Sequence, residues 1–273
     1  MKSLYVIRNT VSDMIHLRLL LVFIGLFPVT CFAQKRTTAV KAIEQSNVVL
    51  DFTPVVDGKP FFLDSVYTSP GGDRYKITNW KFFVSNIALS SSLGKEHAAF
   101  SETKPAVLLI DFSKANHQIL QVDIGEYTDI RLDVGLPRQI NHTDPTSALP
   151  PLDLAQQDMY WEWNSGYIFL LIEGQLLHDQ KDRFHFAIGG DNKIMPFAHG
   201  NLFNAVPLVK VEKGKTTTLR FTFDFNKLLK NGDGSNYSLT AEKARIVHGG
   251  YFADVLSMNA KQAMEFKKVE MRK

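Results

Sequence analysis

Apolar and polar side chains alternate along most of the chain, and this feature restricts its fold more than any other. In Tyr127–Leu136 the apolar residues share one face and the charged residues the other, and Thr216–Phe225 repeats the pattern. Successive side chains of a strand point to opposite faces, so this alternation is typical of half-buried antiparallel strands. Further strands are indicated at Val48–Phe52, Trp80–Ser90 and Val107–Phe112, with a hairpin signal at Gly71-Gly72-Asp73.

Helical patterning is confined to the C-terminal segment. Tyr251–Lys267 carries Val255, Met258 and Phe266 among good helix formers. No internal repeat and no linker divides the chain. Many short strands with almost no helix predict an all-β fold, a single antiparallel β-sandwich with a short C-terminal helix.

The N-terminus has the pattern of a secretory leader. Leu19–Thr30 is an apolar run of 12 residues that follows three basic residues, and Cys31-Phe32-Ala33 resembles a cleavage site. A membrane span needs about 20 residues, so this run is too short to be one. We expect residues 1–33 to be a signal peptide and residues 34–273 to form one domain that is exported to the periplasm or the medium. Translation from Met14 and a lipidated Cys31 are the alternatives.

Charge and cysteine content exclude several classes of partner. The leader holds three of the 31 basic and one of the 28 acidic residues, which leaves the remaining chain with a net charge near +1. This balance gives no reason to expect nucleic acid or an acidic membrane as a partner. Cys31 is the single cysteine and belongs to the leader, so the exported chain has no disulfide and no thiolate metal site.

Common catalytic motifs are absent from the sequence. It contains no GxSxG, HExxH, P-loop or dinucleotide-binding glycine pattern, and we therefore expect no enzyme. Asn231–Glu242 has the length of a calcium loop, but Asn231 and Asn236 stand where that loop needs Asp and Gly. The segment is interpreted as a polar hairpin loop.

Met159–Gly174 is the most unusual stretch of the chain. Its sequence, MYWEWNSGYIFLLIEG, holds two of the three tryptophans and opens into an apolar run. Met159, Trp161 and Trp163 share one face if the strand is regular. Turn-forming residues at Asn164-Ser165-Gly166 then indicate a bulge or a change of strand. The aromatic face is either core or a binding platform.

Histidines are the metal ligands that the exported chain offers. Three of them, His142, His185 and His248, lie near the aromatic stretch or beside glycine pairs. Neutral imidazole suits copper or zinc, and a protein without thiols has to use it. A solitary histidine is also a common surface or core residue, so spacing does not separate these alternatives. The other histidines outside the leader are His97, His117, His178 and His199.

Five segments together resemble the MbnP-like family, the methanobactin-associated periplasmic copper proteins. They are VVLDFTPVVDGKPF, ITNWKFFVSNIAL, VGLPRQINHTDPTSALPPLDL, MYWEWNSGYIFLLIEG and FHFAIGG, which span nearly the whole exported chain. The resemblance implies an exported β-sandwich that binds copper through histidines. In some members of the family a tryptophan near the metal is oxidised to kynurenine by a partner dihaem enzyme (MauG/MbnH-like), and the resemblance extends this expectation to the present chain.

Carried over by position, the resemblance names candidate residues. His142 matches the family's loop histidine, and Trp161 and Trp163 match its WxW pair. The family's strand motif ends in His-Ile/Leu-Gly, whereas this chain has Ala187-Ile188-Gly189. His185 lies two residues earlier on the same strand face, a shift of roughly 6–7 Å. Some family members also carry a cysteine pair that this chain lacks.

The sequence therefore favours an exported copper-binding protein for storage, handover or acquisition of the metal. His142 is the expected first ligand and His185 the second, with His248 and Met159 as further candidates; a Met thioether favours cuprous ion. Trp161 or Trp163 is the expected site of oxidation. The alternative is a non-metal binding or structural module in which the tryptophans are core.

Overall fold

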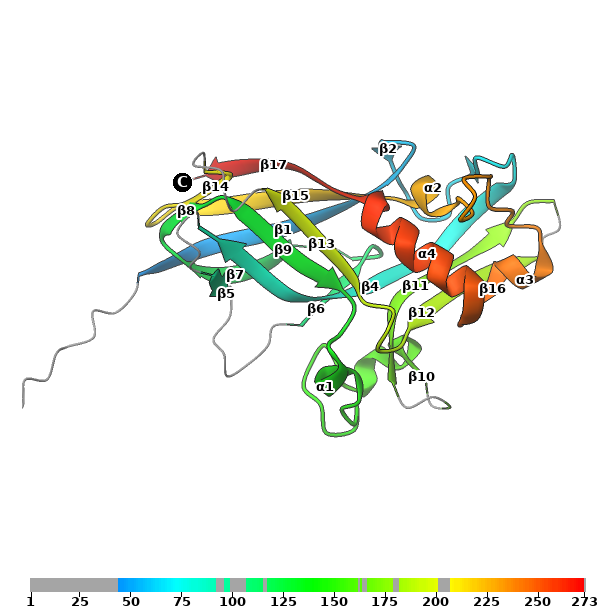
Figure 1. The fold of residues 1–273 in the computed structure, drawn as a ribbon, viewed down its shortest axis with the longest axis horizontal. Helices are drawn as coiled ribbons and strands as arrows, with labels where there is room; N and C mark the ends of the chain where they lie inside the picture. The colour runs from blue at the N-terminus through cyan, green and yellow to red at the C-terminus, as the bar shows by residue number, and fades with distance from the viewer. Residues whose placement is uncertain are drawn as a thin grey trace, which may run out of the picture. The chain divides into compact units, whose positions relative to one another are not determined.

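The structure is a computed structural model that describes most of the chain after residue 43. It covers residues 44–91, 96–98, 107–114, 117–161, 163, 166–178, 182–200 and 207–272. Residues from Ala42 onward form one compact unit, drawn in Figure 1. The expected signal peptide, residues 1–33, lies outside the described residues. No helix in the described part of the chain is long and apolar enough to cross a membrane.

The first of the two main sheets has five strands. Its order is β17-β15-β1-β2, and β7 also pairs with β1. The bounds of these strands are β1 (Gln45–Val56), β2 (Lys59–Pro60), β7 (His117–Asp123), β15 (Thr216–Asp224) and β17 (Met264–Arg272).

The second main sheet has ten strands. Its order is β13-β9-β4-β11-β12-β16, with β3, β5 and β6 on β4 and β10 on β11. The bounds are β3 (Tyr67–Thr68), β4 (Arg74–Ser90), β5 (Glu96–Ala98), β6 (Leu108–Asp111), β9 (Asp129–Val134), β10 (Tyr160–Trp161), β11 (Gly166–Leu176), β12 (Arg183–Gly189), β13 (Met195–Gly200) and β16 (Ile246–Val247). A separate pair joins β8 (Gly125–Tyr127) to β14 (Val209–Val211).

Helices are short and few in the described residues. They are α1 (Arg138–Asn141), the 3-10 helix η1 (Leu154–Met159), α2 (Phe225–Leu228), α3 (Glu242–Arg245) and α4 (Gly250–Ala263). Only α4 is longer than two turns. It buries Ala253, Val255, Leu256, Ala260 and Ala263, the spacing of one apolar helix face.

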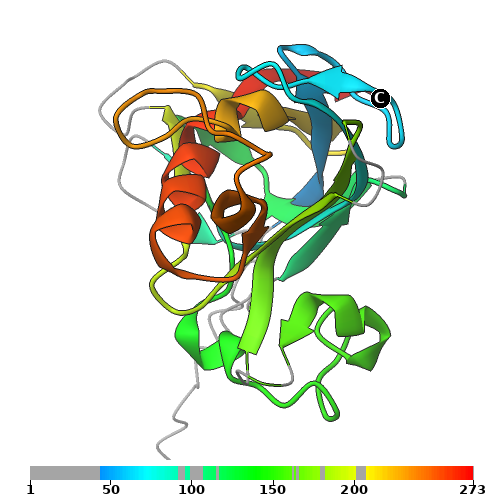
Figure 2. The ribbon, with the colours of Figure 1, turned by 90° about the vertical axis from the view of Figure 1, so that its right-hand side faces the viewer.

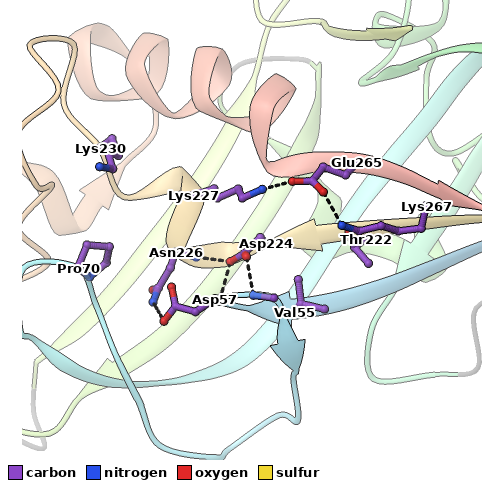
Figure 3. Close-up of a pocket in the computed structure, with 11 residues that line it drawn as sticks. Val55, Asp57, Pro70, Thr222, Asp224, Asn226, Lys227, Lys230, Glu265 and Lys267 are labelled. Carbon is purple, nitrogen blue, oxygen red and sulfur yellow. Dashed lines mark hydrogen bonds and ion pairs between the residues drawn. The ribbon is translucent and has the colours of Figure 1, made fainter. Parts of the chain in front are cut away.

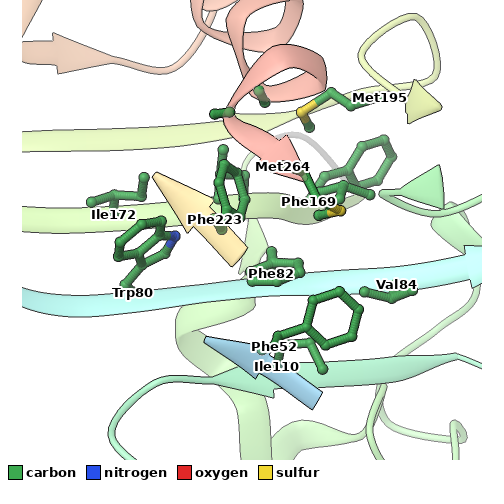
Figure 4. Packing of buried hydrophobic residues seen from close by; sticks show 14 of the residues in the cluster. Phe52, Trp80, Phe82, Val84, Ile110, Phe169, Ile172, Met195, Phe223 and Met264 are labelled. Atoms are coloured by element: carbon green, nitrogen blue, oxygen red, sulfur yellow. The ribbon is translucent and has the colours of Figure 1, made fainter. Parts of the chain in front are cut away.

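Aromatic side chains from both main sheets meet in the core. Phe82 of β4 contacts Phe52 of β1 and Phe223 of β15, with ring centroids 5.6 and 5.3 Å apart. Figure 4 shows these rings between the strands. Each of the three is at most 3% exposed. The alternating apolar residues of β1, β4 and β15 thus form one shared core, as the sequence pattern predicts.

The predicted fold class is confirmed as mostly β, but the arrangement of strands differs from the expected antiparallel sandwich. β1 runs parallel to β15, and β12 runs parallel to β16, so both main sheets are mixed. Figure 2 shows that the sheets curl around the core. The expected helix Tyr251–Lys267 ends at Ala263, and the chain continues as β17 because Met264 and Phe266 pair with apolar residues of β15.

A lobe made of α1, η1 and β10 lies at the end of the second sheet where β11 begins (Figures 1 and 2). Asn141 of α1 ties the lobe to the sheet, because its Oδ1 accepts from the backbone N–H of Tyr167 at 2.9 Å. Tyr167 in turn donates its hydroxyl to the carbonyl of Leu152 at 2.7 Å. The loop that carries His142 is therefore held against the start of β11.

Candidate metal site

The two tryptophans of the WxW segment lie in different environments. β10 ends at Trp161 and pairs with β11 in an antiparallel hairpin, so the predicted change of strand is confirmed. Trp161 is 5% exposed and Trp163 is 69% exposed. Their ring centroids are 5.5 Å apart. A regular strand through both residues is therefore wrong, because the hairpin buries one indole and leaves the other in solvent.

Trp161 lies across the end of β12. A Cβ built on Gly189 would be 3.0 Å from the Trp161 ring and 2.4 Å from the carbonyl oxygen of Tyr167. Only glycine fits there without displacing its neighbours. Ala187, which replaces the histidine of the family motif, lies two residues earlier and is fully buried.

His185 is held by a carboxylate on the neighbouring strand. It pairs in register with Glu173 of β11, and its Nδ1 lies 3.0 Å from Glu173 Oε1. Glu173 Oε2 accepts a second hydrogen bond, from Asn79 Nδ2 at 2.9 Å. The hydrogen bond from His185, helped by that from Asn79, lowers the pKa of Glu173 despite its partial burial. Glu173 was not identified from the sequence; its one signal is a carboxylate within an otherwise apolar strand.

His248 lies beside His185 although the two residues are far apart in the sequence. β16 pairs with β12 in parallel register, which places the following residue, His248, beside His185. The two imidazole rings stack with centroids 5.1 Å apart, and Trp163 lies 6.4 Å from His248. Neighbouring groups that exclude water lower the pKa of His248, and the adjacent His185 adds to the effect. His248 therefore favours the neutral form that binds metal.

His142 belongs to a separate cluster. Its Nε2 lies 3.0 and 3.1 Å from the two carboxylate oxygens of Asp191, beyond the end of β12. Asn141 donates to the same carboxylate at 2.9 Å, and these bonds lower the pKa of Asp191. Gly189, near which this cluster lies, is about 13 Å along the strand from His185. The two expected ligands are therefore not brought to one ion.

The remaining candidate ligand, Met159, and two other histidines do not belong to the stacked pair. Met159 is fully buried and packs in the hydrophobic core. His178 pairs with Asp182 at 2.9 Å, and the ring of His199 lies 4.8 Å from that of Phe266. In the polar loop, Asn231 Nδ2 donates to Ser235 Oγ and to the carbonyl of Asn236.

A pocket of about 530 Å³ lies where β1, β15, α2 and β17 meet (Figure 3). At its centre, Asp224 accepts from the backbone N–H groups of Asp57, Gly58 and Asn226. On its rim, Glu265 pairs with Lys227 and Lys267. These bonds hold the β1–β2 turn and β17 against the end of β15 and the start of α2. Since the carboxylates of Asp224 and Glu265 both have hydrogen-bond partners within the fold, their role is structural.

The chemistry of the donor set fits a metal bound by two imidazoles. Among the residues that the structure describes, no three His, Cys, Asp or Glu side chains gather into a metal-binding group. Of the histidines whose side chains the structure describes, His185 and His248 are the pair whose rings stack. A carboxylate such as Glu173, hydrogen-bonded to His185, is the usual outer partner of a metal-binding histidine. Exposed Trp163 borders this pair, whereas the His142 cluster lies on the Trp161 side.

Comparison with known proteins identifies the family. The family model described as MbnP matches residues 45–248. The chain belongs to the MbnP family. The solved structure titled "MbnP from Methylosinus trichosporium" is similar, with a TM-score of 0.50 and 18% identity over 76% of this chain and 82% of that one. At this identity the structural likeness concerns the fold. No curated protein matches the chain in sequence.

Proposed function

We propose that this MbnP family member binds a copper ion through the imidazoles of His185 and His248. The stacked pair, with centroids 5.1 Å apart, is the observation that carries the proposal. Imidazole alone accommodates several transition metals, and the family resemblance is what selects copper. A surface site with two protein ligands leaves coordination positions to water or to a partner, which suits acquisition or handover of the ion.

Copper titration against a competing chelator tests this function. Wild-type protein should bind about one copper ion, and His185→Ala and His248→Ala should each weaken binding at least tenfold, since even an outer-shell change costs about 10–100-fold. His178→Ala is the matched control, because His178 pairs with Asp182 and does not belong to the stacked pair. Loss of binding in His142→Ala alone would place the ion at the Asp191 cluster and contradict the proposed pair.

We also propose that Trp163 is the tryptophan converted to kynurenine by a dihaem partner. It is 69% exposed and lies 6.4 Å from the ring of His248, while Trp161 is buried. Protein from the native host should show a mass gain of about 4 Da at Trp163. Its chain should begin at Gln34 if residues 1–33 are a signal peptide. An unmodified Trp163, or the mass gain on Trp161, would contradict the assignment.

A further inference from the structure

We infer that Glu173 and Asn79 are positioning residues that fix His185 in the tautomer whose Nε2 binds the metal. This inference rests on the proposed copper function, and it assigns a role to two residues that no sequence motif marks. It is carried by two hydrogen bonds, Glu173 Oε1 with His185 Nδ1 at 3.0 Å and Glu173 Oε2 with Asn79 Nδ2 at 2.9 Å.

A β-bulge lies directly beside this arrangement. The pairing of β11 with β4 shifts register between Glu173 and Gly174, so that Glu173 faces Asn79 while Gly174 faces Ile77. The extra residue, Thr78, donates its hydroxyl to the carbonyl of Glu173 at 3.3 Å. Asn79 keeps the register of the preceding pairs, such as Ile172 with Trp80, so ordinary cross-strand pairing places its amide beside the carboxylate. The bulge begins at the next residue of β4, Thr78, and ends that register.

Gly174 is required at the bulge. A Cβ at this position would lie 2.2 Å from the carbonyl oxygen of Lys76 and 2.2 Å from the Phe184 ring. The carbonyl oxygen belongs to the backbone, so it cannot move aside as a flexible side chain does. The strand sequence Glu173-Gly174 thus places the carboxylate at the last regular pair before the bulge.

The chemistry of the carboxylate sets the tautomer. An ionised carboxylate only accepts hydrogen bonds, so the Nδ1 of His185 must be the donor. In neutral imidazole the other nitrogen, Nε2, then carries the lone pair that a metal needs. Asn79 occupies the second carboxylate oxygen and limits rotation of the Glu173 side chain. The two hydrogen bonds of the Glu173 carboxylate therefore hold the His185 ring in place before the metal binds, so that less side-chain rearrangement is needed on binding.

Nitrogen NMR of the metal-free protein tests the tautomer directly, at a pH where His185 is neutral. Long-range ¹H–¹⁵N spectra of wild type should show the proton of His185 on Nδ1. Glu173→Ala should shift the population toward the Nε2–H form, and Gln175→Ala, a change on the same strand face, should not. A wild-type Nε2–H tautomer, or identical spectra for wild type and Glu173→Ala, would overturn the inference.

Copper affinity then tests the consequence. Glu173→Ala should weaken binding about 10–100-fold and Asn79→Ala by less, because Asn79 acts through Glu173. Gln175→Ala should leave it unchanged, and thermal melts check that every variant is folded. Normal wild-type binding that Glu173→Ala does not weaken would overturn the positioning role alone. If wild-type protein failed to bind copper, the proposed function would be overturned. The role of Glu173 in copper binding would then be overturned as well.

Discussion

At the scale of single residues, the two tryptophans of the WxW segment have different tasks. Trp161 covers Gly189 at the end of β12, where any larger residue would collide with it. Its indole Nε1–H has no hydrogen-bond partner among the described residues, so the ring contributes by packing. Trp163 is exposed beside His248 and contributes little to the core.

Substitution of each tryptophan by phenylalanine should have different effects on the free energy of unfolding. Trp161→Phe should lower the free energy of unfolding by about 1–3 kcal/mol, because it leaves part of a buried volume unfilled. Trp163→Phe should change it by less than about 0.5 kcal/mol, as expected for an exposed side chain. Denaturant unfolding curves of the two variants measure the difference. Equal costs would mean that the two indoles share one environment.

The sequence named most residues of the site but could not group them. His185, His248, Trp161 and Trp163 are recognisable as candidates from their types and neighbours. Glu173 is not, because a single carboxylate in an apolar strand is indistinguishable from a solvated edge residue until its cross-strand partner is known. His142 and His185 are matched to one site by motif position, whereas the backbone places them in separate clusters.

At the scale of elements, strand pairing across long sequence distances decides the site. Alternation identifies β9 and β15 correctly, because each buries one face more than the other, and β4 is recognised although its middle is buried on both faces. The parallel pairing of β16 with β12 has no local signal, because β16 is only two residues long, yet it brings His248 to His185. The sequence pattern extends the expected helix over the first four residues of β17, because Glu265 and Lys267 are good helix formers.

The junction between α2 and β17 predicts a pH dependence of stability. Hydrogen bonds from Lys227 and Lys267 lower the pKa of Glu265 from 4.5 to about 2 (Figure 3). The ionised pair therefore stabilises the fold above pH 4.5, and this contribution is lost as the pH falls toward 2, because the folded carboxylate must then be protonated.

Glu265→Gln should remove that dependence. The variant should be less stable than wild type at pH 7, and the difference should shrink as the pH approaches 2, where wild-type Glu265 is also neutral. Urea unfolding of both proteins at several pH values measures this. A difference that stays constant with pH would show that the junction is held by packing and not by charge.

At the scale of the whole molecule, two curled mixed sheets support a site on their outer face. The family model covers residues 45–248, which begins with β1 and ends at His248. The core accounts for most of the apolar pattern, so the polar cluster on β4, β11 and β12 stands out as a surface feature that packing does not require. The proposed copper site would account for two imidazoles and a carboxylate in contact with one of them at this place.

Anomalous diffraction at the copper absorption edge, from crystals grown with one equivalent of copper, tests the central claim most directly. We predict one strong peak within coordination distance of His185 Nε2 and a ring nitrogen of His248, with the Glu173–His185 hydrogen bond intact. A peak beside His142 and Asp191, or no ordered copper at all, would contradict the account.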